Sequence, residues 1–339
     1  MRRRVLIPLS LALLILVPVT ALQGSDAPGP VIAVGPIAMT VASADRSMAF
    51  YREVLGFEKL SDVQVAGEAW DRLYGTASVR LRVLQMRLGD ERIELMEFLT
   101  PRGRPIPADS RSQDRWFQHI AIIASDMDAA YARLRAARVA HVSPAPQRLP
   151  DWNPKAGGIR AFYFKDPDGH VLEVLWFPPG KGATKWRRTD ALFLGIDHTA
   201  IVIADTARSL ACYRDTLGLV VAGASENWGP EQERLNNVAG ARLRITTLRA
   251  QAGPGIEFLE YLIPRDGRPA PADLRPNDLA HWHTGLVTAN AAVLERALGS
   301  GACAIAASST IAPPGRPSPM APGFLVRDPD RHVMQIVER

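Results

Sequence analysis

Cysteine and aromatic residues are scarce in this chain. Among 339 residues there are 2 cysteines, Cys212 and Cys303, with no CxxC pair and no zinc-finger spacing, and aromatic residues make up 7%. We therefore expect neither a cysteine metal site nor a disulfide framework, and Cys212 is predicted to be a core residue on the apolar face of a helix. The sequence also lacks a GxSxG nucleophile elbow, a phosphate-binding loop and a dinucleotide-binding fingerprint.

A membrane span and a strongly basic surface are also missing. Arg2–Arg4 precede an apolar run, Val5–Val19, and Val19-Thr20-Ala21 is a small-residue cleavage pattern. The run is shorter than the ~20 residues that cross a bilayer. We predict a signal peptide over residues 1–21 and a periplasmic or secreted protein with no stable membrane insertion. Its removal lowers the net charge from +5 to +2, which does not favour nucleic-acid binding.

The chain does contain an internal repeat. PIAMTVASADRSMAFYREVLGF, from Pro36, aligns without a gap on HTAIVIADTARSLACYRDTLGL, from His198, at an offset of 162 residues. Near the end of each copy, DPDGHVLEV (Asp166–Val174) matches DPDRHVMQI (Asp328–Ile336). A match of this length indicates a duplicated unit of domain size.

Each copy has a further rhythm of its own. In the first copy an alternating strand precedes an amphipathic helix at Asp45–Leu55, and strands follow; the order returns with a strand at His119–Ala124 and another helix. We therefore predict an α+β fold of four βαβββ modules. Residues 31–180 and 194–339 would form two domains of two modules each, joined by a linker at 181–193.

Three motifs resemble the vicinal oxygen chelate superfamily, which includes glyoxalase I, methylmalonyl-CoA epimerase, extradiol dioxygenases and bleomycin resistance proteins. They are His198 before alternating apolar residues, SxxFYxxxLGF at Ser47–Phe57, and DPDGHxxE at Asp166–Glu173. The resemblance implies glyoxalase-like curved mixed-sheet half-barrels, each a cup formed by two modules. It implies little about the reaction, because this fold carries many chemistries.

In that superfamily the metal ion takes one residue from the first and one from the last strand of each module. The corresponding residues, in module order, are Pro36 and Glu94, His119 and Glu173, His198 and Glu257, and His283 and Gln335. Proline has no ligand atom and glutamine is a weak ligand, so the first and fourth modules are degraded as metal sites. Imidazole and carboxylate suit a divalent ion such as Zn, Ni, Fe or Mn.

The pairing of the modules decides which site is complete. If the second and third modules share a cup, it holds His119, Glu173, His198 and Glu257, and both losses fall in the other cup. We favour this arrangement. If neighbouring modules pair, the C-terminal site would instead contain His198, Glu257, His283 and Gln335.

Two classes of function follow from the resemblance. The first is a metal-dependent lyase or isomerase that binds a small substrate through vicinal oxygens, with Glu173 or Glu257 moving protons. The second is a metal-free small-molecule binding or resistance-type protein. An extradiol-type dioxygenase fits less well, because it would require a carboxylate where Gln335 stands. A monomer and a homodimer are both compatible with the sequence.

Other polar residues that recur in both copies have structural interpretations. His170 and His332 follow tight turns and are expected only to pack. Arg104 and Arg268 are expected to form salt bridges within their own copy or to recognise an anion.

Overall fold

The computed structural model describes residues 30–298, 302–311 and 323–339. The predicted signal peptide, residues 1–21, lies outside this range. Within the described residues, none of the helices is long and apolar enough to span a bilayer.

The first copy of the repeat forms two modules, and the first of these has two helices. Its elements are β1 (Val31–Thr40), α1 (Ala44–Glu53), β2 (Glu58–Ala66), α2 (Glu68–Tyr74), β3 (Arg80–Leu88) and β4 (Glu91–Thr100). The second module contains β5 (Gln118–Ala124), α3 (Met127–Ala136), β6 (Ala140–His141), β7 (Gln147–Arg148), β8 (Arg160–Lys165) and β9 (Val171–Trp176).

The second copy follows the same order after a short 3₁₀ turn, η1 (Thr184–Arg187), in the predicted linker. The third module contains β10 (Phe193–Ile203), α4 (Thr206–Leu210), the π-helical turn η2 (Ala211–Thr216), β11 (Val220–Trp228), α5 (Pro230–Asn236), β12 (Arg242–Arg249) and β13 (Gly255–Ile263). The fourth contains β14 (Trp282–Thr288), α6 (Ala291–Leu298), β15 (Ala304–Ile311), β16 (Gly323–Arg327) and β17 (Val333–Glu338).

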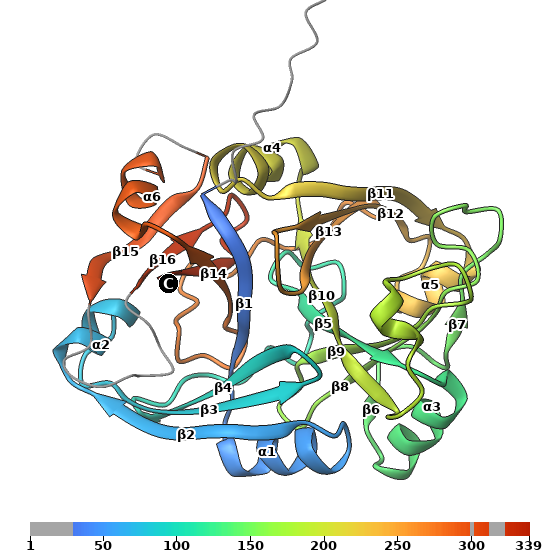
Figure 1. Cartoon of the computed structure of the whole chain (residues 1–339), viewed down its shortest axis with the longest axis horizontal. Coiled ribbons are helices and arrows are strands. Elements are labelled where there is room, and N and C mark those ends of the chain that lie inside the picture. The colour runs from blue at the N-terminus through green and yellow to red at the C-terminus, as the bar shows by residue number, and fades with distance from the viewer. Residues whose placement is uncertain (1–29, 299–301, 312–322) are drawn as a thin grey trace, which may run out of the picture.

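The strands form two curved sheets that lie side by side (Figure 1). The first and fourth modules form an 8-stranded sheet in the order β15-β16-β17-β14-β1-β4-β3-β2. The second and third form a 9-stranded sheet in the order β11-β12-β13-β10-β5-β9-β8-β6, with β7 on β8. The predicted α+β fold and the favoured pairing of the second and third modules are thus confirmed. Each sheet takes one module from each copy, so the units 31–180 and 194–339 describe the sequence repeat and not the sheets.

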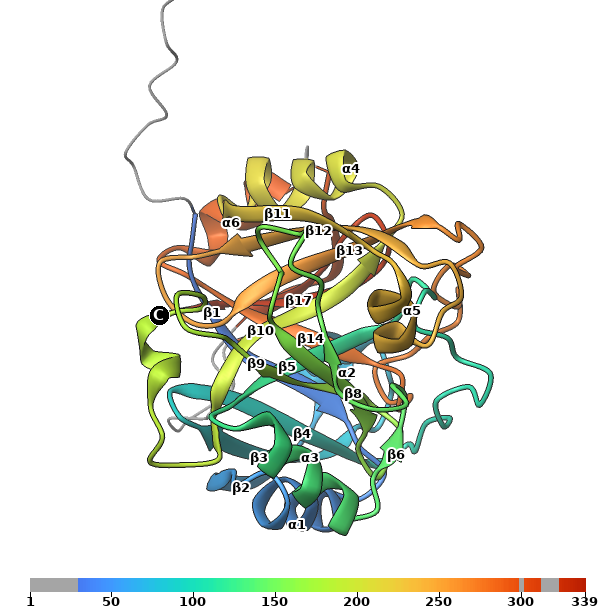
Figure 2. The ribbon, with the colours of Figure 1, turned by 90° about the vertical axis from the view of Figure 1, so that its right-hand side faces the viewer.

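The outer faces of both sheets are buried under helices. Alternate residues of a strand face opposite sides of a sheet, so Ile120 and Ile122 of β5 pack into one large core while Ala121 and Ile123 face the other side. That core includes α1 and α3, and a second core includes η2 and α6. The two groups of helices lie at opposite ends of the molecule (Figure 2). Helix packing therefore covers the outer faces and leaves the inner faces to form the cups.

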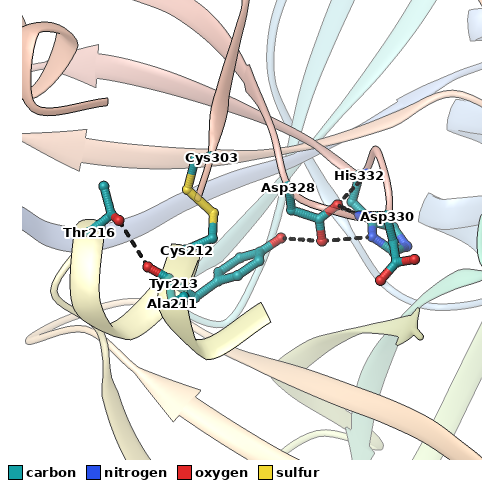
Figure 3. Close-up of a disulfide and its surroundings, with 8 residues drawn as sticks. All are labelled: Ala211, Cys212, Tyr213, Thr216, Cys303, Asp328, Asp330 and His332. Atoms are coloured by element: carbon teal, nitrogen blue, oxygen red, sulfur yellow. Dashed lines mark hydrogen bonds and ion pairs between the residues drawn. A yellow bond between two sulfur atoms is a disulfide. The ribbon is translucent and has the colours of Figure 1, made fainter. Parts of the chain in front are cut away.

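The repeated motifs connect the two modules of each copy. Tyr51 of α1, which is fully buried, donates to Asp166 of the second module over 3.2 Å, and Asp166 also holds the Nδ1 atom of His170 at 2.9 Å. In the second copy Tyr213 donates to Asp328 over 3.4 Å, and Asp328 holds His332 at 2.9 Å (Figure 3). The two histidines are buried parts of this connection, in agreement with the predicted packing role.

The expectation about the cysteines was wrong. Cys212, in η2, and Cys303, just before β15, form a disulfide between the third and fourth modules (Figure 3). Both residues are buried in the same apolar core, so the core position predicted for Cys212 is correct but its partner was missed. The two residues are 91 positions apart, and their spacing gives no indication that α6 brings the chain back to η2. A disulfide that closes a loop of this length stabilises a fold by about 2–5 kcal/mol.

The recurrent arginines form salt bridges between the copies and not within them. Arg104 contacts Asp278 at 2.7 Å and Asp273 at 2.6 Å. Arg268 contacts Asp114 and Asp109 at 2.6 Å each. This exchange follows from the sheets, since each module is paired with a module of the other copy.

Candidate metal centre and active site

Four of the predicted ligands lie on the inner face of the 9-stranded sheet. In the antiparallel pair β5–β10, Ala121 is opposite His198 and His119 is opposite Ala200. In the flanking parallel pairs, Ala121 is opposite Glu173 of β9 and Ala200 is opposite Glu257 of β13. Cross-strand partners share a face, so His119, Glu173, His198 and Glu257 all point to the same side of the sheet.

Three of these side chains form a compact buried cluster. The Nε2 atom of His119 lies 3.3 Å from Oε2 of Glu173, and the Nε2 atom of His198 lies 3.7 Å from the same oxygen. One ligand atom from each of the three residues lies within 4.8 Å of the others. Within the described ranges, no other set of three or more His, Cys, Asp or Glu side chains converges in this way.

The cluster has the chemistry of a divalent metal site. Neither ring nitrogen of His119 has a hydrogen-bond partner, and Nε2 of His198 also has none, although these atoms are buried. Buried polar atoms without partners are rare in folded proteins. Two imidazoles and one carboxylate match the preference of Zn, Ni, Fe or Mn, and a bound ion would satisfy both Nε2 atoms.

Glu257 lies beside the cluster and not inside it. Its Oε1 atom is 3.5 Å from Nε2 of His198, and its Oε2 atom accepts a hydrogen bond of 3.0 Å from Thr247. The side chain is 17% exposed, compared with 6% for Glu173. Glu257 is therefore oriented by Thr247 and open to the cavity, as a carboxylate that moves protons must be.

An aspartate that the sequence analysis missed orients His198. Asp197 accepts from Nδ1 of His198 over 3.0 Å, and is held by Arg249 and by the indole nitrogen of Trp186, each also at 3.0 Å. This bond directs Nε2 of His198 toward the cluster, as carboxylates do for metal-binding histidines. The first copy has Gly35 at the equivalent position, and that difference could have revealed the role of Asp197.

The same contacts determine the charge of His198 before a metal ion binds. Burial opposes the charged imidazole, but Glu257, Asp197 and Glu173 together raise the pKa of His198 to about 9. The pKa of Asp197 is lowered, because its bonds to His198 and Arg249 outweigh its burial. An incoming ion must therefore displace a proton from His198, so metal binding should release a proton at neutral pH.

A cavity of about 550 Å³ opens onto these residues. Glu173, His198 and Glu257 line it, together with Tyr163, Trp186 and residues of the two modules. This volume is within the range of small-molecule binding sites.

Comparison with known proteins identifies the family. The sequence profile of the Glyoxalase/Bleomycin resistance protein/Dioxygenase superfamily matches residues 33–174. A 2-epi-5-epi-valiolone epimerase from Actinomyces sp is 35% identical over 164 residues, which is 47% of this chain and 86% of that protein. The chain belongs to the Glyoxalase/Bleomycin resistance protein/Dioxygenase superfamily.

Solved structures show the superfamily fold over most of the chain. Glyoxalase I from Zea mays is 14% identical with a TM-score of 0.55, and the match covers 90% of this chain and 92% of that one. A putative dioxygenase from Bacillus subtilis is also 14% identical with a TM-score of 0.55, covering 92% and 86%. The predicted family resemblance is thus confirmed, and the likeness to these structures concerns the fold alone.

The other cup of this superfamily member lacks a comparable centre. Glu94 is buried there and accepts a hydrogen bond from Gln85 over 3.2 Å, and burial lowers the pKa of the nearby strand residue His283 to about 4. His283 on β14 and Gln335 on β17 belong to the 8-stranded sheet. The alternative C-terminal site of His198, Glu257, His283 and Gln335 is therefore not assembled, because its members are divided between the two sheets.

Glu94 should make stability depend on pH. Burial raises its pKa to about 7, from 4.5. At pH 4 the carboxyl is largely neutral in both folded and unfolded chains, whereas above pH 7 folding must bury an ionised carboxylate. We expect Glu94→Gln to raise the free energy of unfolding by about 2–3 kcal/mol at pH 8 and by less than about 0.5 kcal/mol at pH 4. Urea unfolding at the two pH values measures this, and an equal gain at both would contradict it.

Proposed function

We propose that this protein is a metal-dependent isomerase that inverts a carbon next to a carbonyl group in a small α-hydroxyketone. The observation that carries the proposal is the buried His119–Glu173–His198 cluster with its unpaired ring nitrogens, opening onto a cavity beside Glu257. The 35% identity to an epimerase supports an isomerase over a lyase.

The cluster residues would hold the ion and define where the substrate binds. A divalent ion held by His119, Glu173 and His198 would polarise the vicinal oxygens of the substrate as a Lewis acid. Asp197 keeps Nε2 of His198 directed inward through the bond to Nδ1. The sheet fixes the histidines and Glu173 on three adjacent strands, so little reorganisation is needed when substrate binds.

Proton transfer is assigned to the carboxylates. Glu257 would take the proton from the carbon next to the carbonyl; the C–H bond breaks and its electron pair moves toward the carbonyl oxygen. Return of a proton to the opposite face of that carbon inverts its configuration. Glu173, which reaches the other side of the same Nε2 atom of His198, is the second carboxylate available for that return.

Elemental analysis followed by a deuterium-exchange assay tests the proposal. The protein would be loaded with Zn, Ni, Fe or Mn and incubated in D₂O with α-hydroxyketones such as 2-hydroxycyclohexanone and pentahydroxycyclohexanone. We expect a single bound ion per chain and metal-dependent incorporation of deuterium at the α-carbon, read by NMR. Ligand binding without metal and without exchange would instead support a metal-free binding protein.

We also propose that the chain is exported through its N-terminal segment. The support is the Arg2–Arg4 and Val5–Val19 pattern together with the Cys212–Cys303 disulfide, because disulfides persist in oxidising compartments. Mass spectrometry of the protein from its native host should show a chain that begins near Leu22, with both cysteines unreactive to thiol reagents until reduced. An intact Met1 or two free thiols would contradict export with cleavage.

A further inference from the structure

One wall of the cavity carries uncharged amide side chains. Asn227, at the end of β11, and Gln232, in α5, line the same cavity as the metal cluster. They are 5% and 2% exposed, and Asn236, one helical turn after Gln232, is fully buried. We call Asn227, Gln232 and Asn236 the amide wall.

The amide wall has hydrogen-bonding capacity that the protein does not use. Gln232 donates to Oδ1 of Asn236, while Oε1 of Gln232 and Nδ2 of Asn236 have no partner. Oδ1 of Asn227 accepts from Asn153 over 2.7 Å and from Ser225 over 3.0 Å, so its NH₂ group is left to donate. Because a buried amide atom without a partner destabilises a fold, these groups call for a ligand.

The first copy shows that the fold does not require amides at these positions. Its equivalents of Asn227, Gln232 and Asn236 are Val65, Trp70 and Tyr74. These belong to or pack against an apolar cluster, and the rings of Trp70 and Tyr74 stack with centroids 6.3 Å apart. Apolar packing suffices in the cup without a metal cluster, and amides occur in the cup that has one.

Charge at the cavity favours a neutral ligand next to the amide wall. Lys185 is paired with Glu91 at 2.5 Å, and Arg249 is paired with Asp197 at 3.0 Å. Lys155, also on the lining, is exposed. The buried polar surface away from the metal cluster is therefore one of amide donors and acceptors.

We propose that the amide wall binds hydroxyl groups of the substrate, and that the substrate is a neutral polyhydroxylated cyclic ketone. This inference rests on the proposed function, which places two vicinal oxygens of the substrate at the metal cluster. A hydroxyl group both donates and accepts, so it matches the free Oε1 of Gln232 and the free NH₂ of Asn227. The cavity of about 550 Å³ has room for a six-membered ring that reaches from the cluster to this wall.

The test compares two α-hydroxyketones that differ only in their remote hydroxyl groups. Calorimetry on the metal-loaded protein would measure the affinities for pentahydroxycyclohexanone and 2-hydroxycyclohexanone. We expect the wild type to prefer the pentahydroxy compound by at least about tenfold. Asn227→Val and the double variant Gln232→Leu/Asn236→Leu should each lose most of this preference, with the affinity for 2-hydroxycyclohexanone changed by less than about threefold. Gln64→Leu, on exposed β2, is the control and should keep it.

A stability measurement separates a binding role from a structural one. The double variant removes the unpaired amide atoms, so its Tm should equal or exceed that of the wild type, whereas a structural role predicts a lower Tm. If the double variant fails to fold, Asn227→Val carries the test. An unchanged preference, or equal weakening for both ketones, overturns the inference. Absence of deuterium exchange with the preference intact would overturn the proposed function and leave the amide wall assigned.

Discussion

His198→Ala is expected to lower the affinity for a divalent metal ion by at least about 100-fold, and isomerase activity should fall with it. His198 supplies a buried Nε2 atom that has no other partner and lies 3.7 Å from Oε2 of Glu173. Its loss leaves one imidazole and one carboxylate in the cluster, which is too few ligands for tight binding. Competition with a coloured chelator at fixed pH would measure the affinity, and elemental analysis would give the metal content.

The second cup supplies the matched control. His283 corresponds to His119 in the fourth module and is equally buried, but it shares its cup with Pro36 and Gln335. His283→Ala should change metal affinity by less than about threefold, whatever it does to Tm. Equal losses in both variants would show that the effect comes from impaired folding, and a larger loss in His283→Ala would move the metal centre to the 8-stranded sheet.

The elements with a strong hydrophobic pattern could be predicted from the sequence. The helix expected at Asp45–Leu55 is observed as Ala44–Glu53, and the strand expected at His119–Ala124 is β5, Gln118–Ala124. Family motifs supplied the α+β fold and the candidate ligands, and the loss of ligands at Pro36 and Gln335 favoured the pairing that the sheets show. That argument succeeded because a cup loses its selection on both sides at once when it no longer binds metal.

Elements without such a pattern were missed. β2 and β11 are edge strands with many exposed residues, and α2 and α5 are helices of seven residues each, too short for a clear amphipathic period. The amide wall lies on β11 and α5 and was missed with them. Reading Gln232 against Trp70 and Asn236 against Tyr74 would have revealed it, because the copies differ there in polarity and not only in size.

Contacts between distant modules were beyond sequence reasoning. The Cys212–Cys303 disulfide and the salt bridges of Arg104 and Arg268 join segments that approach only after the sheets have formed. Residue spacing carries information about one element or one turn, and these contacts depend on the arrangement of four modules. The orientation of His198 by Asp197 is local by comparison, and it was missed because the motif position draws attention to the histidine alone.

Glu257→Gln is expected to lower kcat by about 100- to 10,000-fold while the protein keeps its metal ion. Glutamine keeps the size of the side chain and can still accept from Thr247, but it cannot take a proton from carbon. Metal should be retained because Glu257 lies outside the compact cluster of His119, Glu173 and His198. Deuterium incorporation into the α-hydroxyketone and the metal content of the same sample are the two measurements.

Glu94→Gln is the matched control, since Glu94 occupies the same position in the first module as Glu257 in the third. It should leave kcat and metal content unchanged, even though it raises stability at pH 8. The two readouts also separate the roles open to Glu257. Loss of metal together with activity would make Glu257 a fourth ligand of the ion, as the complete two-histidine, two-glutamate set implies. Full activity in Glu257→Gln would transfer proton removal to Glu173, which is the other carboxylate within reach of His198.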